Sequence, residues 1–434
     1  MTETFLSACR ACGGSHLTPA FTLGTDNAWA FCGDASGEGG CGLLQRATIG
    51  GAKFRHAIPS LSWTEQYRLR GAVAGALEMV TTRDGVALDI GCGNGALLAG
   101  YPRWITPIGI DERLERTGPT DWGIGIADDF LADSAQETLS TTAANGFDII
   151  TCVDALERTD DPTTFLHHVK SLLARDGVFV LETPYAALAL PRTMTSTFHR
   201  QSMAVYTLAT LERLARNAGF RIVRGQMTES AGGSIRLYLS HDTYHGHDYG
   251  PWFEMLARLW DEENALCLKG RAAYHAYQMR LDARAHDVAA LKAQMIRGGE
   301  HAYVIGTCSR TMGMLQAGDL DYDVISAHIG DVAREGFPEI ITDEIARDAA
   351  PDVLIAPTWR RRETLESWQE AVMDGTRIVF VEPELLVVDA SNYAMELGRA
   401  LAVTDGPGSV ETLRAALSAM RGPKLKVVTP LVAV

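Results

Sequence analysis

Apolar positions along the 434-residue chain follow two alternating patterns. Short apolar runs of strand length begin at Gly85 (GVALDI), Pro107 (PIGI) and Phe147 (FDIITCV), and stretches with helical spacing separate them. The alternation resumes at His301 (HAYVIG) and continues to RIVFVEP, which begins at Arg377. Strands that alternate with helices predict a mainly parallel sheet with helices on both faces. We therefore expect an α/β fold with a larger first unit and a second, smaller one.

Two segments interrupt this alternation. Residues 1–55 are rich in Gly and Cys and short of helix signals, which is typical of a small module that needs an additional crosslink. Residues 251–300 contain few Gly or Pro and predict one long helix or two. The expected parts are a cysteine-rich module at 1–55, a first α/β domain at 56–250, a helical connector at 251–300, a second Rossmann-like domain at 301–390 and a tail at 391–434.

Composition narrows the class of protein. The chain has 39 Lys and Arg against 54 Asp and Glu, a formal net charge of −15. Because nucleic-acid binding usually requires a basic face, we expect a small-molecule partner and no nucleic acid. Neither a membrane-length apolar run nor a secretory signal is found, so we expect no membrane partner and a cytoplasmic location. The oligomeric state, monomer or homodimer, stays open.

Half of the eight cysteines lie near the N-terminus: Cys9, Cys12, Cys32 and Cys41. Four thiolates in a short, weakly apolar segment are the expected ligands of a tetrahedral structural Zn²⁺. The gap before the last cysteine is wider than in the usual C-x2-C pair, so His16 and Asp34 are possible substitute ligands. Four unrelated free thiols are the alternative. A closed four-thiolate site would serve folding and not catalysis.

A glycine-rich segment, LDIGCGNG, directly follows the first predicted strand and should open a helix. Its three glycines let the backbone turn tightly and approach a ligand closely. Asp89 lies at the end of that strand, and Asp111 ends the next one, where an acid can accept hydrogen bonds from both hydroxyls of a ribose. We therefore expect a nucleoside site at this edge of the sheet. Its predicted glycines are Gly91, Gly93 and Gly95.

The D-x-G-x-G-x-G spacing resembles the first motif of class I S-adenosylmethionine-dependent methyltransferases. The later ADDF and FDIITCVDALE segments resemble that superfamily as well. The resemblance implies a Rossmann-like core that binds S-adenosylmethionine, with Asp129 near the adenine and Asp154 also lining the cofactor site. An acid-lined pocket suits the cationic sulfonium and amino groups. The alternatives are a nucleotide-binding dehydrogenase and a Rossmann-like domain that binds nothing.

The order of the parts resembles the sugar C-methyltransferases, which methylate nucleotide-activated ketodeoxysugars in antibiotic and surface-polysaccharide pathways. AGGSIRLYLS resembles that family's H-G-G-[SE]-x-R strand, and VIGTCSRTMGML resembles its Y-G-A-x-A-K-G loop. The resemblance implies that the second domain helps to hold a nucleotide diphosphate. Arg236 and Arg310 are then the expected substrate-binding residues, Arg310 standing where the family has Lys.

The acid–base residues of that family are not kept. KFRHAIPSLSW lacks the Tyr-rich stretch, and the family's catalytic His falls on Ser202. His199 lies three residues earlier, and a further family His falls near Glu157. We therefore expect the catalytic group among His199, Glu157 and Tyr206, each of which could instead be structural or solvated.

Three functions follow from these patterns. The favoured one is methyl transfer to a nucleotide-activated ketodeoxysugar or a related natural-product intermediate. The second keeps the scaffold but methylates an oxygen, nitrogen or carbon of a non-sugar metabolite, because the family's base is missing. The third is a non-catalytic, cofactor-binding scaffold protein, which any observed methyl transfer would exclude.

Overall fold

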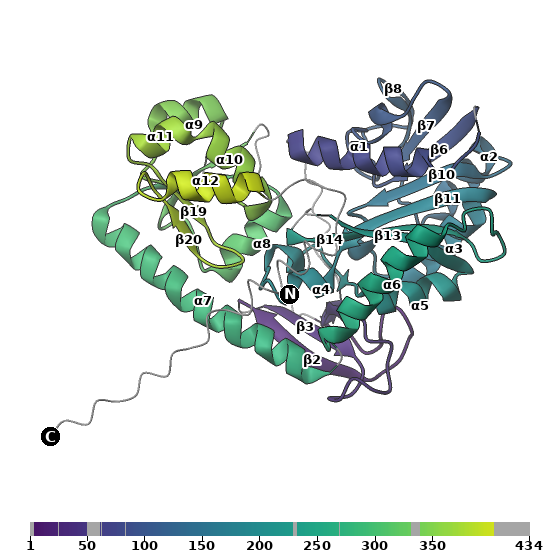
Figure 1. The fold of residues 1–434 in the computed structure, drawn as a ribbon, viewed down its shortest axis with the longest axis horizontal. Helices are drawn as coiled ribbons and strands as arrows, with labels where there is room; N and C mark the ends of the chain where they lie inside the picture. The colour runs from purple at the N-terminus through teal and green to yellow at the C-terminus, as the bar shows by residue number, and fades with distance from the viewer. Residues whose placement is uncertain are drawn as a thin grey trace.

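The computed structural model describes residues 4–24, 26–49, 61, 63–82, 84–228, 232–268, 270–330 and 339–402. Figure 1 shows two α/β lobes, with a long helix and a small sheet running beneath them. Most of the segment without the expected tyrosines, and the tail beyond residue 402 with its predicted last strand, lie outside the described residues.

The first lobe is built on an eight-stranded sheet, and this confirms the α/β fold class. Its five central strands are parallel, and three pairings are antiparallel, two towards one edge of the sheet and one at the other edge. The strand order is β13-β14-β11-β10-β6-β7-β9-β8. The bounds in this order are Phe220–Thr228, Ser234–His241, Leu173–Pro184, Phe147–Val153, Gly85–Ile90, Ile105–Ile110, Gly123–Ile126 and Gly118–Thr120.

Helices cover both faces of this sheet, because its central strands are buried on both sides. On one face, Ala76 of α1 packs with Ala87 and Ile149. On the other face, Leu139 and Phe165 lie in the larger core. The helices of the lobe are α1 (Trp63–Leu77), α2 (Asp133–Thr142), α3 (Pro162–Leu172), α4 (Ala186–Ala189) and α5 (Leu208–Asn217).

Two local predictions in this lobe are wrong. The glycine-rich turn opens only the short 3₁₀ helix η1, Leu98–Gly100, because Gly100 and Pro102 stop the chain from continuing as a helix. The stretch PTTFLHHVKSLLARDG has the apolar spacing of a helix that would end at Gly177, but Gly177 lies inside β11. The preceding helix, α3, already ends at Leu172.

The N-terminal segment forms a small sheet that extends into the first lobe. Its order is β12-β4-β3-β2, and β12 (Ala204–Val205) comes from far along the chain to pair with β4. The N-terminal strands are β1 (Thr4–Phe5), β2 (Leu17–Leu23), β3 (Asn27–Cys32), β4 (Leu44–Arg46) and β5 (Thr48–Ile49). The module and the lobe therefore share one hydrogen-bonded sheet.

Aromatic side chains fix the module against the rest of the molecule. Phe21 of β2 lies with its ring centroid 5.0 Å from that of Phe198 and 4.6 Å from that of Tyr277. Trp29 lies edge-on to the same Phe198 ring at 5.0 Å. Such edge contacts stabilise a cluster beyond its burial alone. Tyr277 belongs to α7, so this cluster joins the module, the first lobe and the connector.

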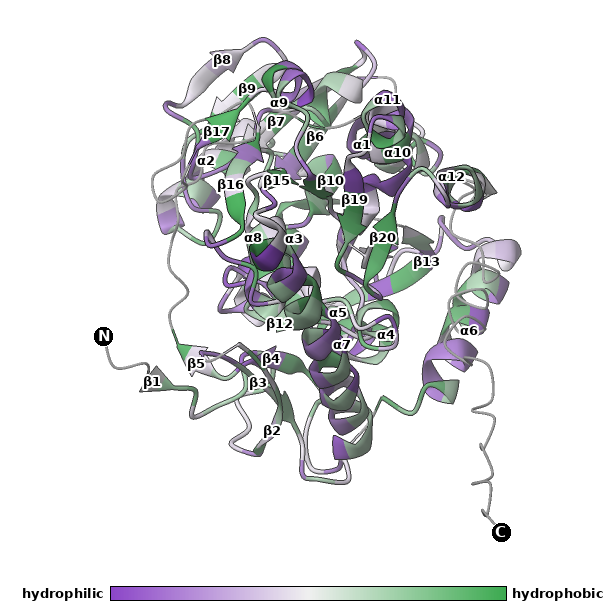
Figure 2. Cartoon of the chain, turned by 90° about the vertical axis from the view of Figure 1, so that its left-hand side faces the viewer, coloured by the Kyte–Doolittle hydropathy of each residue, from purple (hydrophilic) through white to green (hydrophobic). Residues whose placement is uncertain are grey.

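The connector consists of two helices, α6 (Gly250–Ala265) and α7 (Arg271–Gly298). Beyond it, a six-stranded sheet with the order β17-β16-β15-β18-β19-β20 forms the second lobe. Figure 2 shows largely hydrophobic strands in both lobes. The strands of the second sheet are β15 (Ala302–Ile305), β16 (Ile325–Ile329), β17 (Ile340–Ile341), β18 (Val353–Ile355), β19 (Arg377–Phe380) and β20 (Leu386–Val388). The helices of the second lobe are α8 (Ser309–Ala317), α9 (Asp343–Ala349), α10 (Arg361–Ser367), α11 (Gln369–Met373) and α12 (Tyr393–Ala402). Within the described ranges, every helix is too short or too polar to cross a membrane.

Candidate functional site

The glycine-rich loop lies at the carboxyl edge of the first sheet, directly after β6. All three predicted glycines have positive φ: Gly91 at 78°, Gly93 at 54° and Gly95 at 77°. A Cβ on Gly91 would lie 3.0 Å from the Cβ of Ala155, and one on Gly95 would lie 2.2 Å from Nε1 of Trp122. The loop therefore requires glycine both for its backbone conformation and for space.

Asp111, at the end of β7, holds this loop in place. Its Oδ2 accepts a hydrogen bond of 2.9 Å from the backbone N–H of Gly93. The guanidinium of Arg113 forms a two-pronged ion pair with the same carboxylate, at 2.8 Å and 2.5 Å. Burial opposes ionisation of Asp111, but the hydrogen bonds and charge of Arg113 outweigh it, so the pKa lies below its usual range. The carboxylate is therefore ionised and oriented.

Asp89 is 4% exposed and is 2.6 Å from its hydrogen-bond donor, the hydroxyl of Thr151. Burial raises the pKa of Asp89 to about 7, with a smaller contribution from the charge of Asp111 and against the effect of Thr151. The strand ends therefore carry one carboxylate that is always ionised and one that titrates near neutral pH. A cationic ligand would stabilise the ionised form of Asp89.

The other two acids predicted for the cofactor lie further along this edge. Asp129 follows β9 and is exposed, and its Oδ1 accepts a hydrogen bond of 3.0 Å from the backbone N–H of Leu131. Asp154 follows β10 with a φ of 57°, and its backbone N–H donates to Glu182 O at 3.0 Å. Asp129 is exposed to solvent, whereas Asp154 is largely buried within the protein.

A network of buried charges surrounds Asp154. Arg68 of α1 bridges two carboxylates, Asp154 and Glu182, each at 2.9 Å. Arg236 lies 2.6 Å from Glu182, and Arg310, from the N-terminus of α8, lies 2.9 Å from Asp154. The two arginines predicted for substrate binding therefore have carboxylate partners in this structure. The Arg310 pair joins the second lobe to the first.

A second carboxylate, that of Glu157, also lies at this junction. It belongs to the 3₁₀ helix η2 (Leu156–Arg158) and is fully buried. Its Oε1 lies 3.8 Å from Arg310 and 3.9 Å from Arg158, and among the described residues it accepts no hydrogen bond. Burial and the charge of Asp154 raise the pKa of Glu157, although both arginines oppose the shift. A weakly bonded carboxylate with a raised pKa can accept a proton.

His199 has both ring nitrogens engaged and is 1% exposed. Nδ1 accepts from the backbone N–H of Gln201 at 3.2 Å, which places the proton of a neutral ring on Nε2, 3.2 Å from the hydroxyl of Ser202. Burial, together with the charge of Arg310, holds the pKa of His199 well below its usual value. Helix α8 covers this side chain, because a Cβ on Gly313 would lie 3.0 Å from the Cβ of His199. The structure thus gives His199 no lone pair for a substrate.

Tyr206 is also fully buried, and its hydroxyl donates to Leu156 O at 3.3 Å. Burial and the charge of Glu157 raise its pKa well above the usual value. Of the three predicted catalytic groups, Glu157 alone combines an unbonded oxygen with a position where the two lobes meet.

The four N-terminal cysteines come together as a group that could hold a metal ion. Their sulfur atoms all lie within 4.8 Å of one another. The Cys9–Cys41 and Cys12–Cys32 sulfur pairs are each 3.5 Å apart. Tetrahedral zinc with sulfur ligands at 2.3 Å requires sulfurs separated by about 3.8 Å, so the group fits. Asp34 instead accepts from Ser36 and Glu38 in a local turn, and neither it nor His16 belongs to the group.

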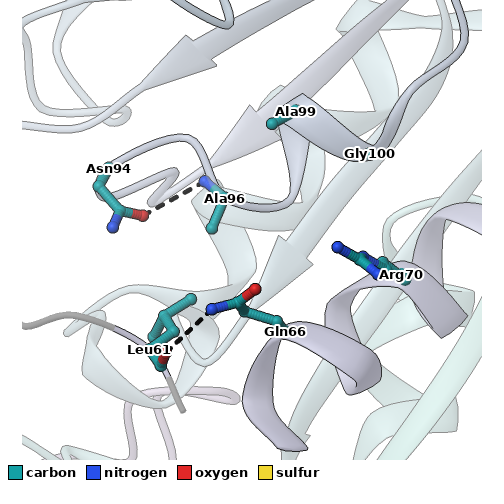
Figure 3. Close-up of a pocket in the computed structure, with 7 residues that line it drawn as sticks. All are labelled: Leu61, Gln66, Arg70, Asn94, Ala96, Ala99 and Gly100. Carbon is teal, nitrogen blue, oxygen red and sulfur yellow. Dashed lines mark hydrogen bonds between the residues drawn. The ribbon is translucent and has the colours of Figure 1, made fainter. Parts of the chain in front are cut away.

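A cavity of ≈ 360 Å³ lies beside the glycine-rich loop, between this loop and α1. Figure 3 shows Gln66 and Arg70 reaching toward it from α1, with Asn94 opposite them. Its cationic lining side chain is Arg70. This cavity was not predicted, because only the fold brings α1 to the loop.

The sequence analysis did not identify several residues that the structure brings into this site. Arg68 and Arg113 belong to no sequence motif. Single arginines are common in surface helices and loops, so neither residue stands out in the sequence. Glu182 did carry a signal, a charged residue inside the apolar run GVFVLETP, which calls for a buried partner.

The comparisons with known proteins agree with this geometry. Residues 64–224 match the family model for a methyltransferase domain, and residues 229–383 match that for a C-methyltransferase C-terminal domain. The chain is 22% identical to C-methyltransferase NovU of Streptomyces niveus over 419 residues, which cover 89% of this chain and 98% of that protein.

Other similar proteins match a smaller share of the chain. Ubiquinone biosynthesis O-methyltransferase of Psychrobacter cryohalolentis is 33% identical over 134 residues, 28% of this chain, and the match spans 51% of that relative, about half its length. A solved 1,6-didemethyltoxoflavin-N1-methyltransferase of Burkholderia thailandensis aligns at 21% identity with a TM-score of 0.32, covering 41% of this chain and 80% of that one.

The sheet, the glycine-rich loop and the first family match define the class of the first lobe: residues 64–224 form a methyltransferase domain of the class I, S-adenosylmethionine-dependent type. Within this class, the second half of the chain carries the C-methyltransferase C-terminal domain.

Proposed function

We propose that the acidic edge of the first sheet binds S-adenosylmethionine. Asp111 would accept the ribose hydroxyls in exchange for Arg113, and Asp129 would accept from the adenine amino group. The glycines would let the backbone approach the ligand. Ionised Asp89 would face the cationic end of the cofactor, which supplies a methyl group on a positively charged sulfur. These assignments are supported by the burial and charge of the two strand-end acids.

Arg70 is our candidate for the cofactor's carboxylate. It lines the cavity that adjoins the glycine-rich loop, together with the amide of Gln66. A guanidinium pairs well with a carboxylate, and this one is not buried in the network around Asp154. By contrast, Asp154 is paired with Arg68 and Arg310, so we assign it a supporting role next to the cofactor.

We infer that the acceptor is a nucleotide-activated ketodeoxysugar or a related biosynthetic intermediate. The observation that carries this proposal is the matched C-methyltransferase C-terminal domain at residues 229–383, in a chain that aligns with a named C-methyltransferase over nearly its full length. The N-terminus of α8, which follows the loop Gly306–Thr307, would offer its first backbone N–H groups to a diphosphate. Arg310 would reach such a group by exchanging Asp154 for it, whereas Arg236 is 2% exposed and stays with Glu182.

Glu157 is the base that this geometry supports. Methylation of carbon next to a ketone requires loss of a proton from that carbon. Glu157 would accept this proton, and the electron pair of the broken C–H bond would form the new bond to the methyl group. The methyl–sulfur bond breaks in the same transfer, and its electrons neutralise the sulfonium. Movement of Arg310 toward the substrate would uncover Glu157.

The test is a methyl-transfer assay with a thymidine diphosphate-linked ketodeoxysugar and S-adenosylmethionine. We expect a product heavier by one methylene, about 14 mass units, and none with Glu157→Gln. In heavy water, wild-type protein without cofactor should exchange the proton next to the ketone, and Glu157→Gln should not. His199→Gln serves as the matched control and should keep the exchange. Methylation that persists in Glu157→Gln would exclude Glu157 as the base.

Oxygen methylation of a non-sugar metabolite is the second candidate. The observation in its favour is the 33% identity of the first lobe to a ubiquinone biosynthesis O-methyltransferase. An oxygen acceptor has its own lone pair, so positioning alone supplies much of the acceleration. A phenolic substrate methylated at the same rate by wild type and Glu157→Gln would favour this function.

We propose that the metal at the four cysteines is Zn²⁺ and that its role is structural. Four sulfur ligands leave no open coordination position for chemistry. Elemental analysis should give one zinc per chain, and Cys12→Ser should reduce this content. Zinc-free protein that keeps its β2–β4 sheet by circular dichroism would contradict the proposal.

A further inference from the structure

Arg10 lies between Cys9 and Cys12, yet its side chain is only 2% exposed. Its guanidinium donates to Arg46 O at 2.7 Å and to Thr48 O at 2.9 Å. A third donor reaches Asp160 at 3.0 Å, in the segment that follows η2. One side chain from the cysteine pair therefore ties three separate parts of the chain together.

A second line of hydrogen bonds leads from the same place to Glu157. The backbone N–H of Arg46 donates to Met203 O at 2.9 Å, and that of Met203 donates to Glu157 O at 2.7 Å. On the other side, the hydroxyl of Thr163 donates to Ala11 O at 2.9 Å. The segment from Glu157 to Thr163 is thus held at one end through Met203 and Arg46, and at the other end by Ala11, which lies beside Cys12.

Such a fork suits arginine and no other residue. Its planar group offers five N–H donors in fixed directions, and its three oxygen acceptors here lie in two segments far apart in the sequence, residues 46–48 and Asp160. Lysine could satisfy only part of this set. Because the cysteine pair is too short to hold its own shape, its position depends on the metal. Metal binding is therefore linked to the position of Arg10 and, through it, to the segment after Glu157.

We propose that Arg10 is a positioning residue that couples metal binding at the four cysteines to the order of the segment Glu157–Asp161. The catalytic meaning of this coupling rests on the proposed role of Glu157, but the coupling itself does not. The metal would act on methyl transfer without touching either the substrate or the cofactor.

The experiment is hydrogen exchange of the full-length protein, together with zinc content and calorimetric binding of S-adenosylhomocysteine. In Arg10→Ala we expect full zinc content, unchanged exchange in β3, and exchange of residues 156–161 faster by about tenfold. Affinity for S-adenosylhomocysteine should change less than twofold, while kcat for methyl transfer falls. Arg10→Lys should restore part of the protection.

Two further variants make the result decisive. Arg213→Ala removes an exposed arginine whose contact in the same module is Gly40 O at 3.4 Å, so segment 156–161 should keep its protection. Asp160→Ala removes only the loop-side partner, which is 62% exposed, and should accelerate exchange there by about threefold even if Arg10→Ala fails to fold.

Unchanged exchange of the segment in both Arg10→Ala and Asp160→Ala would overturn the proposal. Loss of zinc from Arg10→Ala at neutral pH would do so as well, because Arg10 would then serve the module's own fold. Neither result depends on the acceptor. Failure of this proposal and failure of the methyl-transfer assay are therefore separate outcomes.

Discussion

The two lobes share one architecture but end their strands with opposite chemistry. In the first lobe, Asp89 and Asp111 close adjacent parallel strands and face the glycine-rich loop. In the second lobe, Gly306 and Thr307 follow β15, and Gly330 follows β16. An acidic edge suits a cationic ligand, whereas uncharged residues that lead into the N-terminus of a helix, here α8, suit an anionic one.

One acid that follows a parallel strand in the second lobe, Glu382, has a different role. Glu382, just beyond β19, accepts hydrogen bonds from the backbone of Thr195 at 2.7 Å and of Ser196 at 3.2 Å, both in the first lobe. It fixes the lobes to each other. The comparison teaches that the sheet provides a scaffold, while the few residues after each strand decide what it binds.

The largest effect should come from breaking the buried charges beneath the acidic edge. Arg236→Ala would leave Glu182, which is fully buried, with Arg68 as its remaining cation. We expect the free energy of unfolding of the first lobe to fall by about 3–5 kcal/mol, because the buried carboxylate of Glu182 would lose one of its two arginine partners, and incomplete pairing of a buried charge is costly. Urea titration followed by circular dichroism measures this change.

The matched control is Arg360→Ala, which removes a partly exposed ion pair of 3.7 Å between the lobes, to Glu65. It should cost less than about 1 kcal/mol. Equal losses in the two variants would show that the first lobe does not depend on its buried network.

The next effect concerns the ligand. Asp111→Asn keeps the shape of the side chain but removes its charge, so the affinity for S-adenosylhomocysteine should fall by about 10- to 100-fold, the value of charge-assisted hydrogen bonds. Thr307→Ala, at the corresponding edge of the second lobe, should change this affinity less than twofold. Calorimetry measures both, and an equal loss from Thr307→Ala would contradict the division of roles.

The smallest effect is a pH dependence. The pKa of Asp89 is raised to about 7, so the ligand-free protein favours its protonated form and loses stability as pH rises toward that value. A cation requires the ionised form. Affinity for S-adenosylmethionine should therefore increase by about tenfold between pH 6 and pH 8, as the ionised fraction grows.

Asp89→Asn should remove this dependence, since the amide does not titrate. A wild-type affinity that is constant from pH 6 to pH 8 would show that Asp89 is not in contact with the charged part of the cofactor. The measurement is a series of calorimetric titrations at constant ionic strength.

The sequence predicted what depends on local pattern. Short stretches of sequence are enough to identify the glycine-rich loop, its strand-end acids and the four cysteines, because each feature needs particular residues at fixed spacing. The missing α-helix after the loop was not foreseen, since Gly100 and Pro102 outweigh the apolar residues that precede them. Long-range features were also out of reach: the two residues of β12 carry no pattern, and only the docking of α8 explains why His199 is buried.

The most direct test of the division between the lobes is a titration of thymidine diphosphate into protein saturated with S-adenosylhomocysteine, for wild type and Asp111→Asn. The account predicts one nucleotide diphosphate per chain at micromolar affinity, unchanged by Asp111→Asn when the variant is likewise saturated. Absence of binding heat in wild type, or an equal loss of both ligands in the variant, would contradict it.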